Sequence, residues 1–120
     1  MEFRQLGKSV CRFRFLCFGT GTFGGGSEFF RAWGETDVKE ATRLIEVCME
    51  AGVNFFDTAD VYSQGRPEEI LGKAIRQAPR ESVLISTKAT CPFGEGPNHA
   101  GSSRHHLTRQ IDGNCFGYVA

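Results

Sequence analysis

Three polar residues of this sequence have the types needed for a proton-transfer site: Asp57, Tyr62 and Lys88. A lysine ammonium beside a tyrosine favours the phenolate and lowers the tyrosine pKa, and an aspartate beside the lysine keeps the lysine charged. A phenol whose ordinary pKa is near ~10 then becomes a useful acid near neutral pH. Each residue also has a structural interpretation, in which Asp57 caps a loop, Lys88 is solvated and Tyr62 packs.

The strands expected around these residues would bring them together. Asp57 lies near the carboxyl end of an apolar segment, residues 53–58 (VNFFDT), and Lys88 follows another, residues 83–87 (VLIST). Tyr62 lies in the loop after the first segment. Because the carboxyl ends of parallel strands converge on the ligand crevice of an α/β fold, we expect the three side chains to meet there.

Apolar and amphipathic segments alternate along the chain, as in an α/β fold. The first ~13 residues, with Gly7-Lys8-Ser9 between two short apolar runs, predict a hairpin. A continuous apolar run at residues 15–18 predicts a strand buried on both faces. Helices are expected at residues 38–50, from Pro67 onward, and from Ser103 to about residue 112.

The helix at residues 38–50 carries the clearest signals. Asp37 is its expected N-cap, and Glu40, three residues on, completes a capping-box pattern. The segment before this helix is expected to be irregular but packed through its aromatic residues, Phe29, Phe30 and Trp33. Three apolar strands with helices between them predict a parallel sheet, in either a doubly wound sheet or a (β/α)8 barrel, and the pattern does not separate the two.

The glycine-rich loop after the first of these strands matches G-x-G-x-x-G over Gly19-Thr20-Gly21-Thr22-Phe23-Gly24. In a dinucleotide-binding turn a helix opens inside this motif, so that the pyrophosphate lies at its N-terminus. Here the next expected helix begins only after Asp37. We therefore favour a flexible strand-to-helix loop near a ligand over a free-standing nucleotide-binding domain.

Composition excludes several function classes. The formal net charge of zero argues against nucleic-acid binding, and no apolar run approaches the ~20 residues of a membrane span. The N-terminal residues lack a signal-peptide core, and the five cysteines are odd in number and scattered, which favours the cytoplasm. No metal is expected, because His99, His105 and His106 have no zinc-site spacing, and His105 and His106 are interpreted as helix-surface residues.

Three motifs occur in order with suitable spacing: GVNFFDTADVY at residues 52–62, EEILG at residues 68–72 and VLISTK at residues 83–88. With RQLGKS at residues 4–9 and FGTGTFG at residues 18–24, they closely resemble the aldo-keto reductase family. The resemblance covers about residues 3–112. It favours the (β/α)8 TIM barrel, of which this chain would supply the N-terminal part: a β-hairpin and three parallel strands.

The resemblance implies an oxidoreductase that uses NADPH to reduce aldehydes or ketones, with a small carbonyl compound as its substrate. Matching positions make Tyr62 the general acid, Lys88 the residue that lowers its pKa, and Asp57 the ion-pair partner of Lys88. The cofactor-binding residues implied at the nicotinamide end are Gly19, Thr20, Gly21, Thr22 and Asp57.

A (β/α)8 barrel needs about 250 residues. We therefore expect residues 1–112 to be the N-terminal portion of a reductase barrel, and residues 113–120 to be a divergent tail. The family's catalytic histidine lies on a later strand, so no histidine here receives its role, and a truncated, inactive fragment is expected. The alternative is a non-catalytic interaction module whose exposed sheet edges pair with another chain. The oligomeric state is left open.

Overall fold

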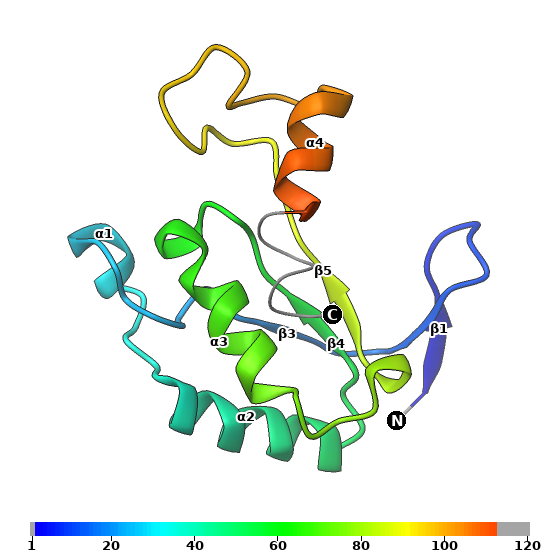
Figure 1. Ribbon diagram of the computed structural model, residues 1–120. Helices are drawn as coiled ribbons and strands as arrows, with labels where there is room; N and C mark the ends of the chain where they lie inside the picture. The colour runs from blue at the N-terminus through cyan, green and yellow to red at the C-terminus, as the bar shows by residue number, and fades with distance from the viewer. Residues whose placement is uncertain (1, 113–120) are drawn as a thin grey trace.

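The computed structural model describes residues 2–112 and begins with the predicted hairpin (Figure 1). Strand β1 (Phe3–Gln5) pairs antiparallel with β2 (Arg12–Arg14). The guanidinium of Arg14 lies 4.0 Å from the ring centroid of Phe3, so the arginine covers an aromatic face across the hairpin. The hairpin prediction is confirmed.

A second, parallel sheet carries the rest of the fold. Its strands are β3 (Cys17–Gly19), β4 (Phe55–Asp57) and β5 (Leu84–Ser86), in the spatial order β3-β4-β5. Gly19 is in register with Asp57, and Asp57 with Ser86. The carboxyl ends of the three strands are therefore level with one another. The predicted α/β class and parallel sheet are confirmed.

Helix α2 (Val38–Glu50) has the bounds that the sequence predicts. The side chain of Asp37 accepts a hydrogen bond from the Glu40 N–H at 2.9 Å, which satisfies one of the free amides at the helix start. Ala41 and Ile45, one turn apart, are buried. The helix therefore packs one apolar stripe on the sheet, as its periodicity predicts.

Helix α3 (Arg66–Ala74) follows a 3₁₀ turn, η1 (Tyr62–Gly65), and a second turn, η2 (Arg80–Ser82), leads into β5. Pro67 lies in the first turn of α3, as predicted. Helices α2 and α3 lie side by side on one face of the sheet (Figure 1). The core between the two layers is formed by Phe23, Ala41, Ile45, Phe56, Ile70, Leu71, Ala74, Ile75 and Val83.

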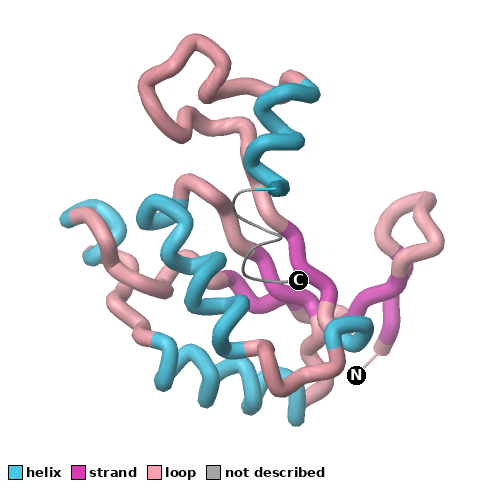
Figure 2. Tube along the Cα trace, viewed as in Figure 1, coloured by secondary structure: helices cyan, strands magenta, loops and turns pink. Residues whose placement is uncertain are grey.

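The long loop after β5 leads to α4 (Arg104–Gln110), whose first turn is capped by Ser103 (Figure 2). His106 is 0% exposed, so its predicted place on the helix surface is wrong. Gln110, one turn further on, is also buried, so this stripe of α4 faces the protein rather than solvent. Burial raises the pKa of Asp60 by more than the Val61 backbone hydrogen bond and the nearby His106 lower it.

The short helix α1 (Glu28–Arg31) lies in the segment expected to be irregular. Ser27 caps it by accepting a hydrogen bond from the Phe30 N–H at 3.4 Å. Four residues are too few to give a helical period in the sequence, so the pattern did not predict it. Phe29, expected to pack, is 65% exposed.

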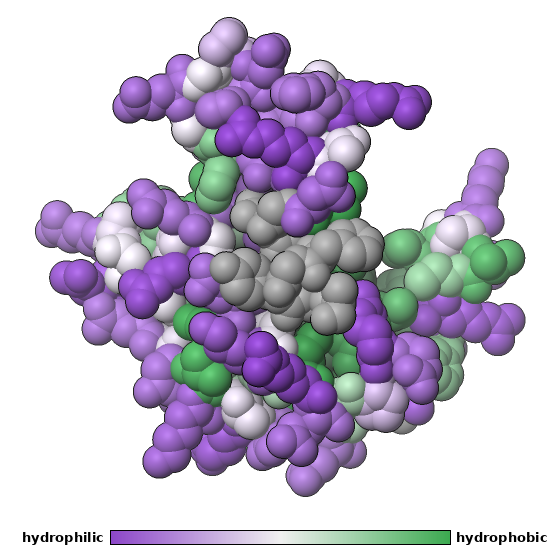
Figure 3. Space-filling model, in the orientation of Figure 1, coloured by the Kyte–Doolittle hydropathy of each residue, from purple (hydrophilic) through white to green (hydrophobic). Residues whose placement is uncertain are grey.

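The strands are not buried on both faces, in contrast to the prediction for residues 15–18. Phe15 and Leu16 precede β3 and are 56% and 51% exposed. Helices cover one face of the sheet. Among residues 2–112, the hairpin covers part of the other face, where the ring centroids of Phe13 and Phe55 lie 5.1 Å apart. Exposed apolar side chains also gather on the hairpin, including Phe3, Leu6 and Val10 (Figure 3).

Residues 2–112 hold neither a membrane-spanning helix nor a group of metal-ligating side chains. No helix among residues 2–112 is long and apolar enough to cross a membrane. In the same part of the chain, no three His, Cys, Asp or Glu side chains gather closely enough to hold a metal ion. The expected divergent tail, residues 113–120, lies outside the described residues.

Candidate active site

The three residues predicted to act together lie at one end of the parallel sheet. Asp57 is the last residue of β4, Tyr62 begins η1 and Lys88 follows β5. The loops after β4 and β5 are joined by a hydrogen bond from the Asp60 N–H to the Lys88 carbonyl at 3.1 Å. This backbone hydrogen bond thus fixes the position of Lys88 relative to the end of β4.

Lys88 is held by two oxygen atoms from the β4 end. Its Nζ donates to Asp57 Oδ2 at 2.6 Å and to the backbone carbonyl of Thr58 at 2.7 Å. Both side chains remain accessible, 49% exposed for Lys88 and 34% for Asp57. The ammonium is therefore oriented, yet open to a bound molecule.

Tyr62 lies against the ammonium. Lys88 Nζ is 5.1 Å from the centroid of the Tyr62 ring, within the range of a cation–π contact. The structure therefore brings Asp57, Lys88 and Tyr62 together in one cluster, although they are separated in sequence.

The surroundings of Lys88 keep it positively charged. Partial burial alone lowers the pKa of Lys88, but the hydrogen bond and charge of Asp57, with a smaller contribution from Tyr62, outweigh burial and leave this pKa above its ordinary value. A charged lysine next to the tyrosine is what proton donation from the phenol requires, because the cation stabilises the phenolate that forms.

The glycine-rich loop starts at the same rim. Thr20 is 0% exposed, and both its N–H and its hydroxyl donate to the Asp57 carbonyl, at 2.9 and 3.1 Å. Gly19 is exposed, and a Cβ there would meet no atom within 4 Å. Thr20 thus ties the loop to β4, while the backbone at Gly19 stays open.

The later residues of this loop have other partners. A Cβ on Gly21 would lie 3.3 Å from the Trp33 ring. The Thr22 carbonyl accepts the Thr36 N–H at 3.1 Å, next to an isolated parallel bridge between Phe23 and Thr36. No helix opens inside the G-x-G-x-x-G motif, so the strand–turn–helix setting of a dinucleotide-binding turn is absent from this loop.

Two aromatic residues beside Tyr62 were not predicted as part of the site. The ring centroids of Phe30 and Trp33 lie 6.2 and 6.0 Å from that of Tyr62. The sequence signal for their role was the run of aromatic residues between glycines, because a solvated loop rarely holds so many aromatic side chains. Their position depends on how the loop folds back, which no local pattern specifies.

Comparison with known proteins identifies the family. The sequence model of the Aldo/keto reductase family matches residues 15–115. A probable voltage-gated potassium channel subunit beta from Oryza sativa subsp. japonica is 42% identical over 117 residues, 95% of this chain and 33% of that protein. A protein of the same name from Arabidopsis thaliana is 44% identical over 110 residues, 89% of this chain and 30% of that protein.

A solved structure agrees with the sequence matches. The aldo-keto reductase AKR11C1 from Bacillus halodurans, in its holo form, superposes with a TM-score of 0.77 at 28% identity, covering 99% of this chain and 36% of that one. The chain thus spans about a third of the length of these relatives. Its sheet corresponds to the N-terminal part of a reductase barrel, and the chain belongs to the aldo/keto reductase family.

Proposed function

We propose that this chain supplies the proton-donating part of the active site in a cytoplasmic, NADPH-dependent reductase of aldehydes or ketones. The observation that carries the proposal is the cluster at the end of the sheet, where Lys88 Nζ is bonded to Asp57 at 2.6 Å and lies 5.1 Å from the centre of the Tyr62 ring. Cytoplasmic location is supported by free cysteines among the described residues, Cys11, Cys17, Cys48 and Cys91.

The rim fits the nicotinamide end of a dinucleotide. The backbone at Gly19 is open and Thr20 fixes the loop on β4, so a planar ring has room against Gly19. Asp57, at the end of the neighbouring strand, would face the same ring. Gly19, Thr20, Gly21, Thr22 and Asp57 are therefore the residues proposed to hold this end of NADPH, which supplies the hydride when bound.

The mechanism assigns one task to each member of the cluster. Tyr62 donates the phenolic proton to the carbonyl oxygen as negative charge develops there. Lys88 stabilises the resulting phenolate, and Asp57 with the Thr58 carbonyl holds the ammonium in place.

The first test is a chimera, because the chain spans about a third of its relatives. Residues 15–112 would replace the matching part of the Bacillus halodurans reductase. We expect NADPH-dependent reduction of an aldehyde, and Tyr62→Phe to lower kcat by about 10²–10⁴-fold with the Kd for NADPH changed less than about twofold. Unchanged kcat in the folded Tyr62→Phe chimera would remove Tyr62 as the acid.

A second candidate function is an interaction module that pairs with another chain. The exposed apolar residues Phe15 and Leu16 beside β3, which has no pairing partner on its outer side among residues 2–112, favour it. The two plant relatives are named as channel subunits, so a channel complex is the class of partner that this candidate indicates. A complex of defined mass with a second protein on size-exclusion chromatography would support this candidate, and aggregation of the isolated chain would count against it.

A further inference from the structure

The N-terminal hairpin carries an excess of positive charge. Residues 3–16 contain four basic residues and no acidic residue, although the formal net charge of the whole chain is zero. The basic residues are Arg4, Lys8, Arg12 and Arg14. The remainder of the chain is therefore net negative, and the hairpin is set apart from it by its charge.

The register of the hairpin gathers two of these cations on one face. Arg14 is opposite Phe3, and Arg12 is opposite Gln5. Residues that lie opposite each other in an antiparallel pair have their side chains on the same face. Phe13 lies between the two arginines in β2, so its side chain is on the other face. Arg12 and Arg14 therefore share one face with Phe3.

The face that carries Phe13 is turned toward the parallel sheet. Phe13 and Cys11 line a groove together with residues of β4 and β5. The hairpin is also attached through its backbone, because the Arg14 N–H donates to the side-chain oxygen of Asn54, just before β4, at 3.0 Å. The opposite face, with Arg12 and Arg14, therefore points away from the sheet.

The outward face and the tip of the hairpin combine cations with exposed apolar side chains. Phe3, whose ring lies 4.0 Å from the Arg14 guanidinium, is 51% exposed, and Val10 at the tip is 97% exposed. Among residues 2–112, neither Lys8 nor Arg12 has an ion-pair partner. Anionic headgroups above an apolar layer match both features, and a bilayer accepts a protruding apolar side chain without a shaped pocket.

We propose that the outward face of the hairpin binds the surface of an anionic lipid bilayer. Lys8, Arg12 and Arg14 lie at the headgroups, and Val10 inserts below them. The contact is made on the membrane and not across it, since no helix among residues 2–112 is long and apolar enough to span a bilayer. The proposal does not depend on the proposed reductase function.

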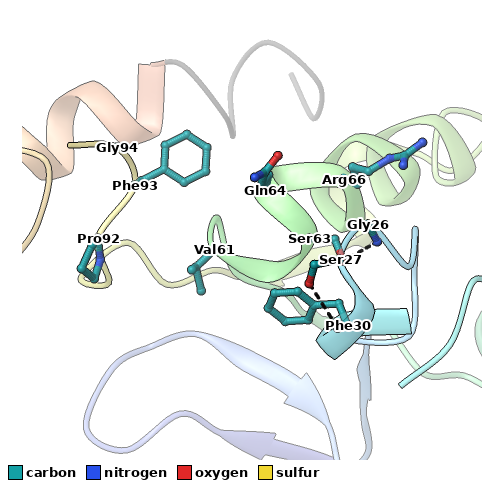
Figure 4. A pocket seen from close by; sticks show the side chains of 10 residues that line it. All are labelled: Gly26, Ser27, Phe30, Val61, Ser63, Gln64, Arg66, Pro92, Phe93 and Gly94. Atoms are coloured by element: carbon teal, nitrogen blue, oxygen red, sulfur yellow. Dashed lines mark hydrogen bonds between the residues drawn. The ribbon is translucent and has the colours of Figure 1, made fainter. Parts of the chain in front are cut away.

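This orientation leaves the proposed active site accessible. The hairpin is attached at Asn54, before β4 begins, whereas Asp57 is the last residue of β4. The hairpin and α1 lie on opposite sides of the sheet (Figure 1). The pocket drawn in Figure 4 is lined by residues from α1, η1 and the loop after β5, and no hairpin residue lines it. A molecule can therefore reach that pocket while the hairpin is on a membrane.

The test is flotation of the 120-residue chain with lipid vesicles, at a protein concentration where light scattering gives a monomer. The vesicles are phosphatidylcholine alone or phosphatidylcholine with about 30% phosphatidylserine. We expect the chain to bind the anionic vesicles at least about tenfold more tightly. Most of this binding should be lost at about 0.5 M salt, because exposed charges are then screened.

Substitutions that remove one charge locate the contact. Lys8→Gln and Arg12→Gln should each weaken binding to anionic vesicles by about three- to fivefold. Lys39→Gln in α2 and Arg76→Gln after α3 are the matched controls, since both residues are exposed and lie outside the hairpin. Each control should change the affinity less than about twofold. Urea denaturation checks that all four variants fold.

The tip is tested separately with Val10→Ser, which removes apolar area and no charge. It should weaken binding by about threefold and leave the salt dependence unchanged. Unchanged affinity would overturn the insertion of Val10. Equal binding to both kinds of vesicle, or equal effects of the hairpin and control substitutions, would overturn the proposal as a whole. Binding to soluble polyglutamate without binding to vesicles would overturn it in favour of an acidic protein partner.

Discussion

At the scale of single residues, the Asp57–Lys88 pair contributes little to stability. Both side chains are partly exposed, and ion pairs of this kind contribute less than about 1 kcal/mol to the free energy of unfolding. The pair nevertheless fixes one ammonium nitrogen beside the Tyr62 ring. A change at Lys88 is therefore expected to affect proton transfer far more than folding.

The stability contribution of Lys88 has a defined pH dependence. Its folded-state pKa is above the ordinary 10.5, so the contribution is fully present below 10.5 and is lost as pH rises through the folded value. Lys88→Met should therefore lower the free energy of unfolding by less than about 1 kcal/mol at pH 7. Urea denaturation at pH 7 and pH 11 should show the difference between the two proteins shrinking, and a difference that grew at pH 11 would contradict this.

The sequence predicted this cluster because the position of each charged residue depends only on the strand that precedes it. Asp57 and Lys88 each follow an apolar strand, and the ends of parallel strands meet whatever the loops do. The contacts of Tyr62 with Phe30 and Trp33 had no such local cause. They depend on a helix of four residues and on two close glycine packings at the base of the loop after β3, which we call the neck (residues 22–25 and 34–36). Neither feature has a periodic signal in the sequence.

At the scale of elements, α2 and α1 show what makes a helix predictable. Helix α2 has thirteen residues, a capping aspartate and an apolar stripe that repeats over several turns, so its bounds follow from the pattern. Helix α1 has a serine cap but a single turn. The burial of His106 also escaped prediction, because it depends on how the loop after β5 returns α4 to the protein.

A substitution in the neck tests whether its packing positions Trp33. Gly34 has φ +151°, and a Cβ there would also lie 3.0 Å from the Thr22 carbonyl oxygen. Gly34→Ala should therefore lower the free energy of unfolding by about 1–3 kcal/mol and shift the Trp33 emission maximum. Emission spectra and urea denaturation measure the two effects.

Gly7→Ala is the control for that change. Gly7 also has a positive φ, +55°, but a Cβ there would meet nothing within 4 Å. It should cost about 1 kcal/mol from backbone strain and leave the Trp33 emission unchanged. Identical spectra for the Gly34 variant and the unmodified chain would show that the neck does not position Trp33.

At the scale of the whole molecule, the described sheet is covered on one face and largely open on the other. Helices α2 and α3 bury Phe56 completely, while Phe15 and Leu16 beside the edge strand stay half exposed. With a net charge of zero, little repulsion opposes contact between such surfaces. Self-association through this region is therefore expected for the isolated chain.

The double variant Phe15→Ser/Leu16→Ser tests this expectation. It should raise the fraction of monomer at high protein concentration, because about half of each side chain's surface is apolar area facing solvent. Size-exclusion chromatography with light scattering measures the mass. Val10→Ser is the control, because Val10 is also exposed but lies between β1 and β2 and not beside β3, so its substitution should leave the mass unchanged. Equal masses for the double variant and the unmodified chain would contradict this expectation.

The neck also has a consequence for how such a protein diversifies. Because Phe23 and Thr36 are already joined across its base, residues 26–33 can change in length with little entropic cost to the rest of the fold. These residues therefore form a replaceable segment beside the proposed active site. Replacing this segment with segments of other composition would change the surface beside Tyr62, while the sheet and helices α2 and α3 stay the same.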